Sequence, residues 1–252
     1  MRKNVIIRCA MVLMCLAVLT SCGSRGYHDL PFGGMNGRVQ KVTVWHLMPE
    51  MWHAGNEGTD VMYVNTSVYD VYGNEICSAV LDSAERVQAE AESLYENGVC
   101  VRSIQKAGGR TIARLSLISN EKGKLVYNKE MDGRVVRMTV KESSFGRRHK
   151  SVVSEDGNVT MISIIRTDRK GYPKKIITTD AKTGLKTTET NIFDENHNVI
   201  EKHIATNDGK EEQITFTQYS EPDEHGNWKD CRTYNDFKLP VEVLVREVEY
   251  WE

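Results

Sequence analysis

Histidine, cysteine and carboxylate side chains are the groups in this sequence that could act as acids, bases, nucleophiles or metal ligands. None of the seven histidines is paired at the i, i+4 spacing, with a glutamate between, that a helical zinc protease requires. The carboxylates are numerous and turn-like in their placement, so no general acid–base pair stands out, and no turn has the ligand spacing of an EF-hand. We therefore predict no catalytic residue, no metal site and no cofactor, and we expect a protein that is not an enzyme.

One cysteine, in contrast, follows a segment with the three parts of a secretory signal. Arg2 and Lys3 precede an apolar stretch at 5–19, which is shorter than the roughly 20 residues of a membrane-spanning helix. The quartet Leu19-Thr20-Ser21-Cys22 resembles the lipobox of bacterial lipoproteins, in which the chain is cut before the cysteine and the cysteine is acylated. This resemblance implies a signal peptide at 1–21, lipidation of Cys22 and a tether at 22–36.

The expected location follows from the anchor and the tether. The tether contains no run of acidic residues of the kind that sends lipoproteins to the cell surface in some bacterial groups. We expect a lipid-anchored protein of the outer membrane that faces the periplasm rather than the outside.

Removal of the signal changes the charge and the cysteine count. The 33 basic residues lose Arg2, Lys3 and Arg8, which leaves 30 against 35 acidic residues and a formal charge of −5. A mildly acidic chain without a basic block is a poor candidate for binding nucleic acid. Three cysteines other than the anchor remain, which allows at most one disulfide and leaves the pairing open; the alternative is small apolar side chains partly buried in a sheet: Cys77, Cys100 and Cys231.

Turn chemistry recurs along the mature chain at a nearly fixed interval. From Gly157 the steps to Gly171, Gly184, His197 and Gly209 are 14, 13, 13 and 12 residues, which is one strand plus one turn each. Asp or Asn opens such a turn by bonding to its own backbone, and glycine accepts the positive φ of a tight hairpin. At His197 we expect a neighbouring asparagine, Asn196 or Asn198, to take the left-handed conformation instead.

The segments between these turns are rich in Ile, Val, Thr, Phe and Tyr, which favours strands. Residues 82–95 are ambiguous, because Asp82 and Glu85 are spaced as a helix capping box, whereas polar and small residues alternate strictly from Arg86 to Tyr95. We favour a strand there. Because several strands have two half-polar faces, the prediction is an all-β, repeat-built antiparallel meander or extended sheet of successive hairpins, rather than a thick two-layer core.

Three of the turns resemble a known repeat. Tyr69-Asp70-x-Tyr72-Gly73-Asn74, Phe193-Asp194-x-x-x-Asn198 and Asp223-Glu224-His225-Gly226-Asn227-Trp228 look like the YD unit of Rhs-type proteins. With the closing segment 245–250, the whole arrangement is similar to a group of uncharacterised bacterial lipoproteins with degenerate YD-like repeats. The resemblance covers residues 37–252 and implies a single β domain, and no catalytic residue comes with it.

Tryptophan gives the remaining binding signal. The four tryptophans would form a stacking platform for a glycan if they stood exposed on one sheet face, and otherwise they fill the core: Trp45, Trp52, Trp228 and Trp251. We therefore expect a lipid-anchored envelope protein that offers a non-enzymatic interaction surface to an envelope protein, with a glycan-binding accessory protein as the alternative. The expected partners are the membrane, through the anchor, and an envelope protein or glycan.

Overall fold

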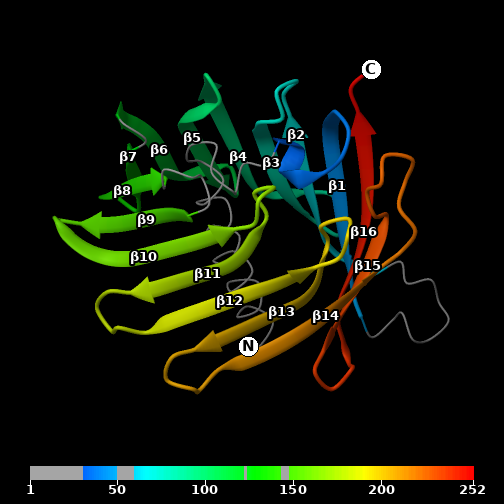
Figure 1. The fold of residues 1–252 in the computed structure, drawn as a ribbon. Coiled ribbons are helices and arrows are strands. Elements are labelled where there is room, and N and C mark those ends of the chain that lie inside the picture. The colour runs from blue at the N-terminus through cyan, green and yellow to red at the C-terminus, as the bar shows by residue number, and fades with distance from the viewer. Residues whose placement is uncertain (1–30, 50–59, 122–123, 143–147) are drawn as a thin grey trace.

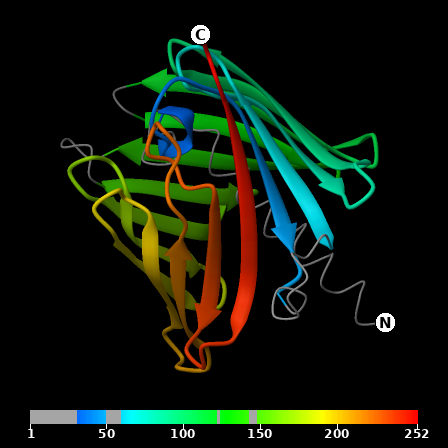
Figure 2. The same ribbon diagram turned by 90° about the vertical axis from the view of Figure 1, so that its right-hand side faces the viewer.

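The chain folds as a closed antiparallel β-barrel (Figures 1 and 2). The structure, a computed structural model, describes residues 31–49, 60–121, 124–142 and 148–252. Within these ranges every strand pairs with its neighbours in sequence, and β1 also pairs with β16, which closes the sheet. No helix in the described ranges is long and apolar enough to cross a bilayer.

A single 3-10 turn, η2 (Pro31–Gly34), precedes sixteen strands in the described part of the chain. The strands are β1 (Val39–Leu47), β2 (Val61–Tyr69), β3 (Glu75–Asp82), β4 (Val87–Glu96), β5 (Val99–Ala107), β6 (Arg110–Glu121), β7 (Lys124–Met131), β8 (Arg134–Glu142), β9 (Arg148–Glu155), β10 (Asn158–Thr167), β11 (Pro173–Asp180), β12 (Lys186–Phe193), β13 (Val199–Thr206), β14 (Glu212–Tyr219), β15 (Asp230–Asn235) and β16 (Pro240–Tyr250).

Because all strands run antiparallel, the connections sort to two ends of the barrel. We call the end that carries residues 31–38, the end of β16 and the turns after even-numbered strands the strap end. We call residues 31–38 the strap. The far end carries the turns after β3, β5, β7, β9, β11, β13 and β15. In Figure 2 η2 lies among the strand ends at the strap end.

The inner face of the barrel holds most of the buried side chains. Paired positions on six successive strands fall on this face: Val42, Ser67, Ser78, Ala91, Gln105 and Ala113. Leu115 and Tyr127 continue it and form a buried cluster with Cys100 and Leu125. A second cluster joins Val39, Val42 and Tyr69 to Met35 of the strap. Since the strap contacts these residues from inside the barrel end, this face is the interior.

The outer face alternates with it and carries many charges. Glu92, Arg114 and Arg137 stand exposed near the middle of β4, β6 and β8. Lys106 bridges Glu90 and Glu92 there at 3.1 and 2.8 Å. The outside of these strands therefore mixes exposed charged side chains with exposed apolar ones, such as Leu94, Ile118 and Val135.

The all-β, antiparallel, hairpin-by-hairpin prediction is confirmed in part, and its open form is wrong, because β1–β16 pairing removes the free edges. Residues 87–96 form strand β4, so the helix alternative for 82–95 is wrong; Asp82 opens a turn instead of capping a helix. In the turn between β12 and β13, His197 itself has a φ of 65°. The expectation that Asn196 or Asn198 takes the left-handed conformation there is therefore also wrong. The strands run from residue 39 to residue 250.

Candidate functional site

A five-residue turn recurs at both ends of the barrel. Its opening Asp or Asn accepts the backbone N–H groups two and four residues later, and the fourth residue has a positive φ. At the strap end such turns open at Asp70, Asp168, Asp194 and Asp223, although in the third only the later N–H bond is present. The repeated Asp residues therefore shape the backbone, and their carboxylates are occupied by the turn itself.

The fourth of these turns differs because its asparagine bonds to the strap. In the turns at Asp70 and Asp194, the closing asparagine amides, of Asn74 and Asn198, donate to the turn's own aspartate at 2.7 and 2.9 Å. Asn227 is 4% exposed; its Oδ1 accepts the N–H of Asn36 at 2.9 Å, and its Nδ2 donates to the carbonyl of Asn36 at 2.9 Å. The side chain thus pairs with the strap backbone as a neighbouring strand would.

A tyrosine and an aspartate complete this attachment. The Tyr250 hydroxyl donates to Asp223 Oδ2 at 2.5 Å and accepts the Asn227 Nδ2–H at 2.7 Å. Burial raises the pKa of the Asp223 carboxyl, but the hydrogen bonds from Tyr250, Asn227 and His225 outweigh it, and the net pKa lies below its ordinary value. Farther along the strap, the Tyr172 hydroxyl donates to the Gly34 carbonyl at 3.3 Å.

Strap and strands enclose a cavity of about 350 Å³ at this end. Its wall on the strand side is largely aromatic: Tyr172 lies with its ring 4.4 Å from that of His197 and 5.9 Å from that of Phe193. Tyr219 and Trp228 continue the wall, with ring centroids 5.7 Å apart. The lining contains no Asp or Glu among the described residues.

Arg246 on β16 contributes the cation of this cavity. Its guanidinium lies 3.6 Å from the centroid of the Trp228 ring, and Nε donates to the Trp228 carbonyl at 2.9 Å. Burial lowers the pKa of Arg246 to about 10. Among the described residues no carboxylate oxygen lies within 4.0 Å of this guanidinium. The site therefore holds a desolvated cation without an ion-pair partner in the described chain.

In two other polar clusters of the described chain, the histidine side chains already have partners within the cluster. His46 stacks on Tyr63 at 4.0 Å, bonds Asn65 at 2.9 Å and lies 3.6 Å from Glu242, so both ring nitrogens have neighbours. His203 pairs with Glu201 on the outer face. No group of three His, Cys, Asp or Glu side chains in the described ranges is arranged to hold a metal ion.

The residues singled out from the sequence are spread over the molecule. Trp45 lies on the outer face of β1, between Val64 and Val245 of the neighbouring strands. Trp228 lines the cavity. Trp251 follows β16, and its backbone N–H donates to the Arg38 carbonyl at 2.8 Å. Trp52 and Cys22 lie outside the described residues. The structure thus does not gather the described tryptophans on one face.

The structure gives the oxidation state of two of the three cysteines considered for a disulfide. Cys77 and Cys231 are both free thiols, so no pair among Cys77, Cys100 and Cys231 forms a disulfide. Cys231 is buried on the inner face, and burial raises the pKa of its thiol to about 12. It is therefore an inert, small apolar side chain rather than a reactive thiol.

Sequence reasoning did not identify the cavity residues other than Trp228. Arg246 and Tyr250 appear in the sequence as part of a strand with two mixed faces, and Asn227 appears as one more turn asparagine. The signal that distinguishes the fourth turn is the Trp228 that follows it, because that residue supplies both the ring and the carbonyl which hold Arg246.

Comparison with known proteins gives likenesses of structure. No family model and no curated protein matches the chain. The crystal structure of a porin-like protein from Bacteroides uniformis ATCC 8492 aligns with a TM-score of 0.52 at 10% identity and covers 85% of this chain and 99% of that one. That of a porin-like protein from Bacteroides vulgatus ATCC 8482 aligns with a TM-score of 0.42 at 12% identity, covering 84% and 98%. The first likeness supports the barrel fold and, at this identity, nothing beyond the fold.

Proposed function

We propose that this chain is a lipid-anchored, non-catalytic binding protein of the cell envelope. Its barrel stands in the aqueous phase beside the membrane and takes a small ligand at the strap end. The observation that carries the proposal is the cavity of about 350 Å³, whose size falls within the range of small-molecule pockets and whose lining combines aromatic side chains with one partly buried cation.

The outer face of the barrel argues against a bilayer-spanning position. Charged side chains such as Glu92, Arg114 and Arg137 are exposed at mid-strand on the outside. An Arg or Lys that faces lipid at the bilayer midplane costs about 2–4 kcal/mol. The lipid-facing wall of a spanning barrel is an uninterrupted apolar band, and these strands do not supply one.

The lipid anchor, if Cys22 carries it, also orients the barrel. Nine residue steps separate Cys22 from Pro31, and an extended chain covers at most about 3.3–3.6 Å per residue, or about 30 Å in all. The strap end would then face the membrane, and the far end would point away from it. Three acyl chains would give a durable anchor.

The non-catalytic assignment is supported by the chemistry of the lining. A general acid–base site needs titratable groups within hydrogen-bond reach of a substrate. The described lining offers a single imidazole, of His197, and no carboxylate. Barrel closure also leaves no free sheet edge in the described chain for strand addition, so a docking mode that extends a sheet is disfavoured.

The anchoring half of the proposal is tested by exchanging the signal. The native segment 1–22 is replaced with an ordinary cleavable secretory signal, and the barrel is then fractionated from cells without detergent. We expect the native chain in the membrane fraction with acylated Cys22 by mass spectrometry, and the exchanged chain in the soluble fraction. A folded exchanged chain that stays in the membrane would show that the barrel itself spans the bilayer.

The binding half is tested by filling the cavity. The full lipidated chain in detergent is melted with and without a small-molecule and glycan extract of the bacterial envelope. We expect the extract to raise Tm by mass action, and we expect Val199→Trp, at a residue that lines the cavity, to abolish the rise. Val159→Trp, on the exposed far end of β10, is the matched control. An equal rise in all three proteins places binding elsewhere.

A further inference from the structure

The strap-end cavity has a chemical preference that can be deduced from its lining. We propose that it binds an acidic sugar unit, whose carboxylate or phosphate group is held by the guanidinium of Arg246. This inference rests on the proposed function and names the ligand class of the same cavity.

The charge of the cavity is the first argument. The mature chain has more acidic than basic residues, yet the described lining contains Arg246 and His197 and no Asp or Glu. Burying a cation is costly unless an anion or strong acceptors compensate it. Within the described residues, Arg246 has one side-chain hydrogen-bond acceptor, the Trp228 carbonyl, and it lies against the Trp228 ring. An anionic ligand would supply the compensation that the described chain does not.

The orientation of the guanidinium is the second argument. Stacking on Trp228 and the Nε bond to its carbonyl fix the plane of the group. Within the described residues, the two terminal nitrogens of the guanidinium make no hydrogen bond and no ion pair, and the group's other contact is with the Trp228 ring. A planar guanidinium with a free terminal edge is the donor that pairs with carboxylate or phosphate through two parallel hydrogen bonds.

The nearby acidic groups do not fill this role. Asp223 influences Arg246 electrostatically, but its carboxylate accepts the backbone N–H groups of His225 and Asn227 and the hydroxyl of Tyr250. Burial raises the pKa of the Tyr219 phenol strongly, so that group is neutral beside the cation. The anion that the guanidinium lacks must therefore come from outside the described chain.

The walls and the size of the cavity indicate a sugar ring as the body of the ligand. Aromatic rings provide flat apolar surfaces, and the side-chain amide of Asn196, which also lines the cavity, provides polar groups for hydroxyls. A volume of about 350 Å³ lies at the small end of ligand pockets. Such a unit could come from an envelope polysaccharide or from an acidic lipid headgroup, since the anchored strap end would lie near the bilayer.

Calorimetric titration of the full lipidated chain in detergent micelles tests this inference. The probes are glucuronate, glucose 6-phosphate and, as the neutral match, glucose. We expect at least one acidic sugar to bind about tenfold or more tightly than glucose, which corresponds to a difference of about 1.4 kcal/mol. Arg246→Met, which keeps the apolar stem over Trp228, should remove this preference, while Arg246→Lys should retain part of it.

Arg166→Met, at an exposed position on β10, is the control for loss of a positive charge, and each variant is melted to confirm that it folds. Equal affinity for glucose and both acidic sugars, no binding of any probe at millimolar concentration, or full acidic-sugar binding by folded Arg246→Met would overturn the inference. The proposed function is judged separately, because Val199→Trp would still abolish the rise in Tm with envelope extract if the cavity bound a neutral ligand.

A final arm distinguishes the two sources of the anion. Phosphatidylcholine vesicles with or without phosphatidylinositol, whose headgroup joins a phosphate to a six-membered polyol ring, are added as competitors to the chain loaded with the acidic sugar. Displacement only by the phosphatidylinositol vesicles supports a lipid headgroup as the source, and no displacement by either supports a polysaccharide.

Discussion

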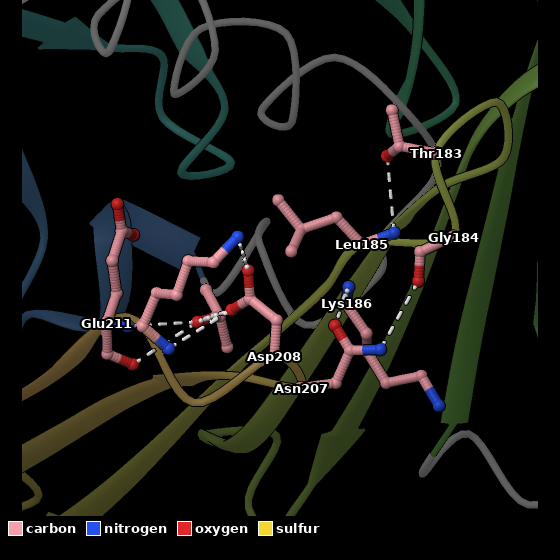
Figure 3. A network of polar contacts seen from close by, with 9 residues as sticks. Thr183, Gly184, Leu185, Lys186, Asn207, Asp208 and Glu211 are labelled. Carbon is pink, nitrogen blue, oxygen red and sulfur yellow. Dashed lines mark hydrogen bonds and ion pairs between the residues drawn. The ribbon is translucent and has the colours of Figure 1, made fainter.

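The two ends of the barrel use the same turn chemistry for different purposes. At the far end the turns are occupied with themselves and with their nearest neighbour. Figure 3 shows this at Asn207, whose Oδ1 accepts the N–H of Lys186 at 2.8 Å and whose Nδ2 donates to the Gly184 carbonyl at 3.4 Å. At the strap end, Asn227 bonds a segment 191 residues away in the chain.

The space around the glycines also differs between the two ends of the barrel. At the far end Gly184 and Gly209 have positive φ and open space where a Cβ would stand. At the strap end, a Cβ on Gly33 would lie 2.9 Å from the Tyr69 hydroxyl, and one on Gly37 would lie 3.0 Å from the Tyr250 ring. The far end therefore only reverses the chain, whereas the strap end is packed, and the packed end is the one that encloses a cavity.

The largest effect should come from Asn227→Ala. The change removes three hydrogen bonds of a buried side chain and leaves the N–H and carbonyl of Asn36 without these partners. We expect a loss of about 2–4 kcal/mol in the free energy of unfolding, measured by urea denaturation. Asn198→Ala is the matched control, because that side chain bonds only within its own turn, and it should lose about 1 kcal/mol. Equal losses would mean that the strap is not held by Asn227.

The next effect should come from glycine substitutions at the two ends. Gly37→Ala places a Cβ at a φ of +83° against Tyr250 and His225, at 3.0 and 3.2 Å, so strain and crowding add. We expect a loss of about 2–3 kcal/mol in thermal or chemical denaturation. Gly209→Ala, with a φ of +67° and nothing within 4 Å, should lose about 1 kcal/mol from strain alone. The comparison fails if the far-end variant is the less stable of the two.

Acid should loosen the strap end through Asp223. The folded-state pKa of this carboxyl is below its unfolded value, because the hydrogen bonds to it outweigh its burial. Its contribution to stability is therefore complete above the unfolded pKa, near 3.9, and is lost as the pH falls through the lower folded pKa. We expect Asp223→Asn to lower Tm at neutral pH and to differ less from the native chain as the pH falls below about 4. A Tm difference that is constant between pH 7 and pH 3 would contradict this.

The local part of this architecture could be predicted from the sequence, and the closing part could not. Turns at Asp70, Asp194 and Asp223 were predictable because an Asx residue and a positive φ are encoded within five residues. Barrel closure depends on β1 pairing with β16 across about two hundred residues. Both strands have faces that mix polar and apolar residues, so their sequences do not identify the strand with which each one pairs.

The cavity was hidden for the same reason. Arg246 alternates with Val245 and Glu247, so the sequence alone does not say whether it faces solvent or the barrel interior. Only the register with β1, which pairs it with Val44, places it on the inner face. The sequence predicts Trp228 as a binding residue, but its contact with Arg246 depends on the fold, which brings the fourth turn against β16.

The smallest effect should come from Asn207→Ala at the far end. The side chain is exposed, and its two bonds to the neighbouring turn can be replaced by water, so little desolvation is left uncompensated. We expect a loss of about 0.5–1 kcal/mol by urea denaturation, against the larger loss for Asn227→Ala. Because Asn207 lies at the opposite end from the cavity, its replacement should also leave the Tm rise with envelope extract unchanged. A loss as large as that of Asn227→Ala would show that hydrogen bonds between segments stabilise both ends equally, and that burial against the strap adds nothing.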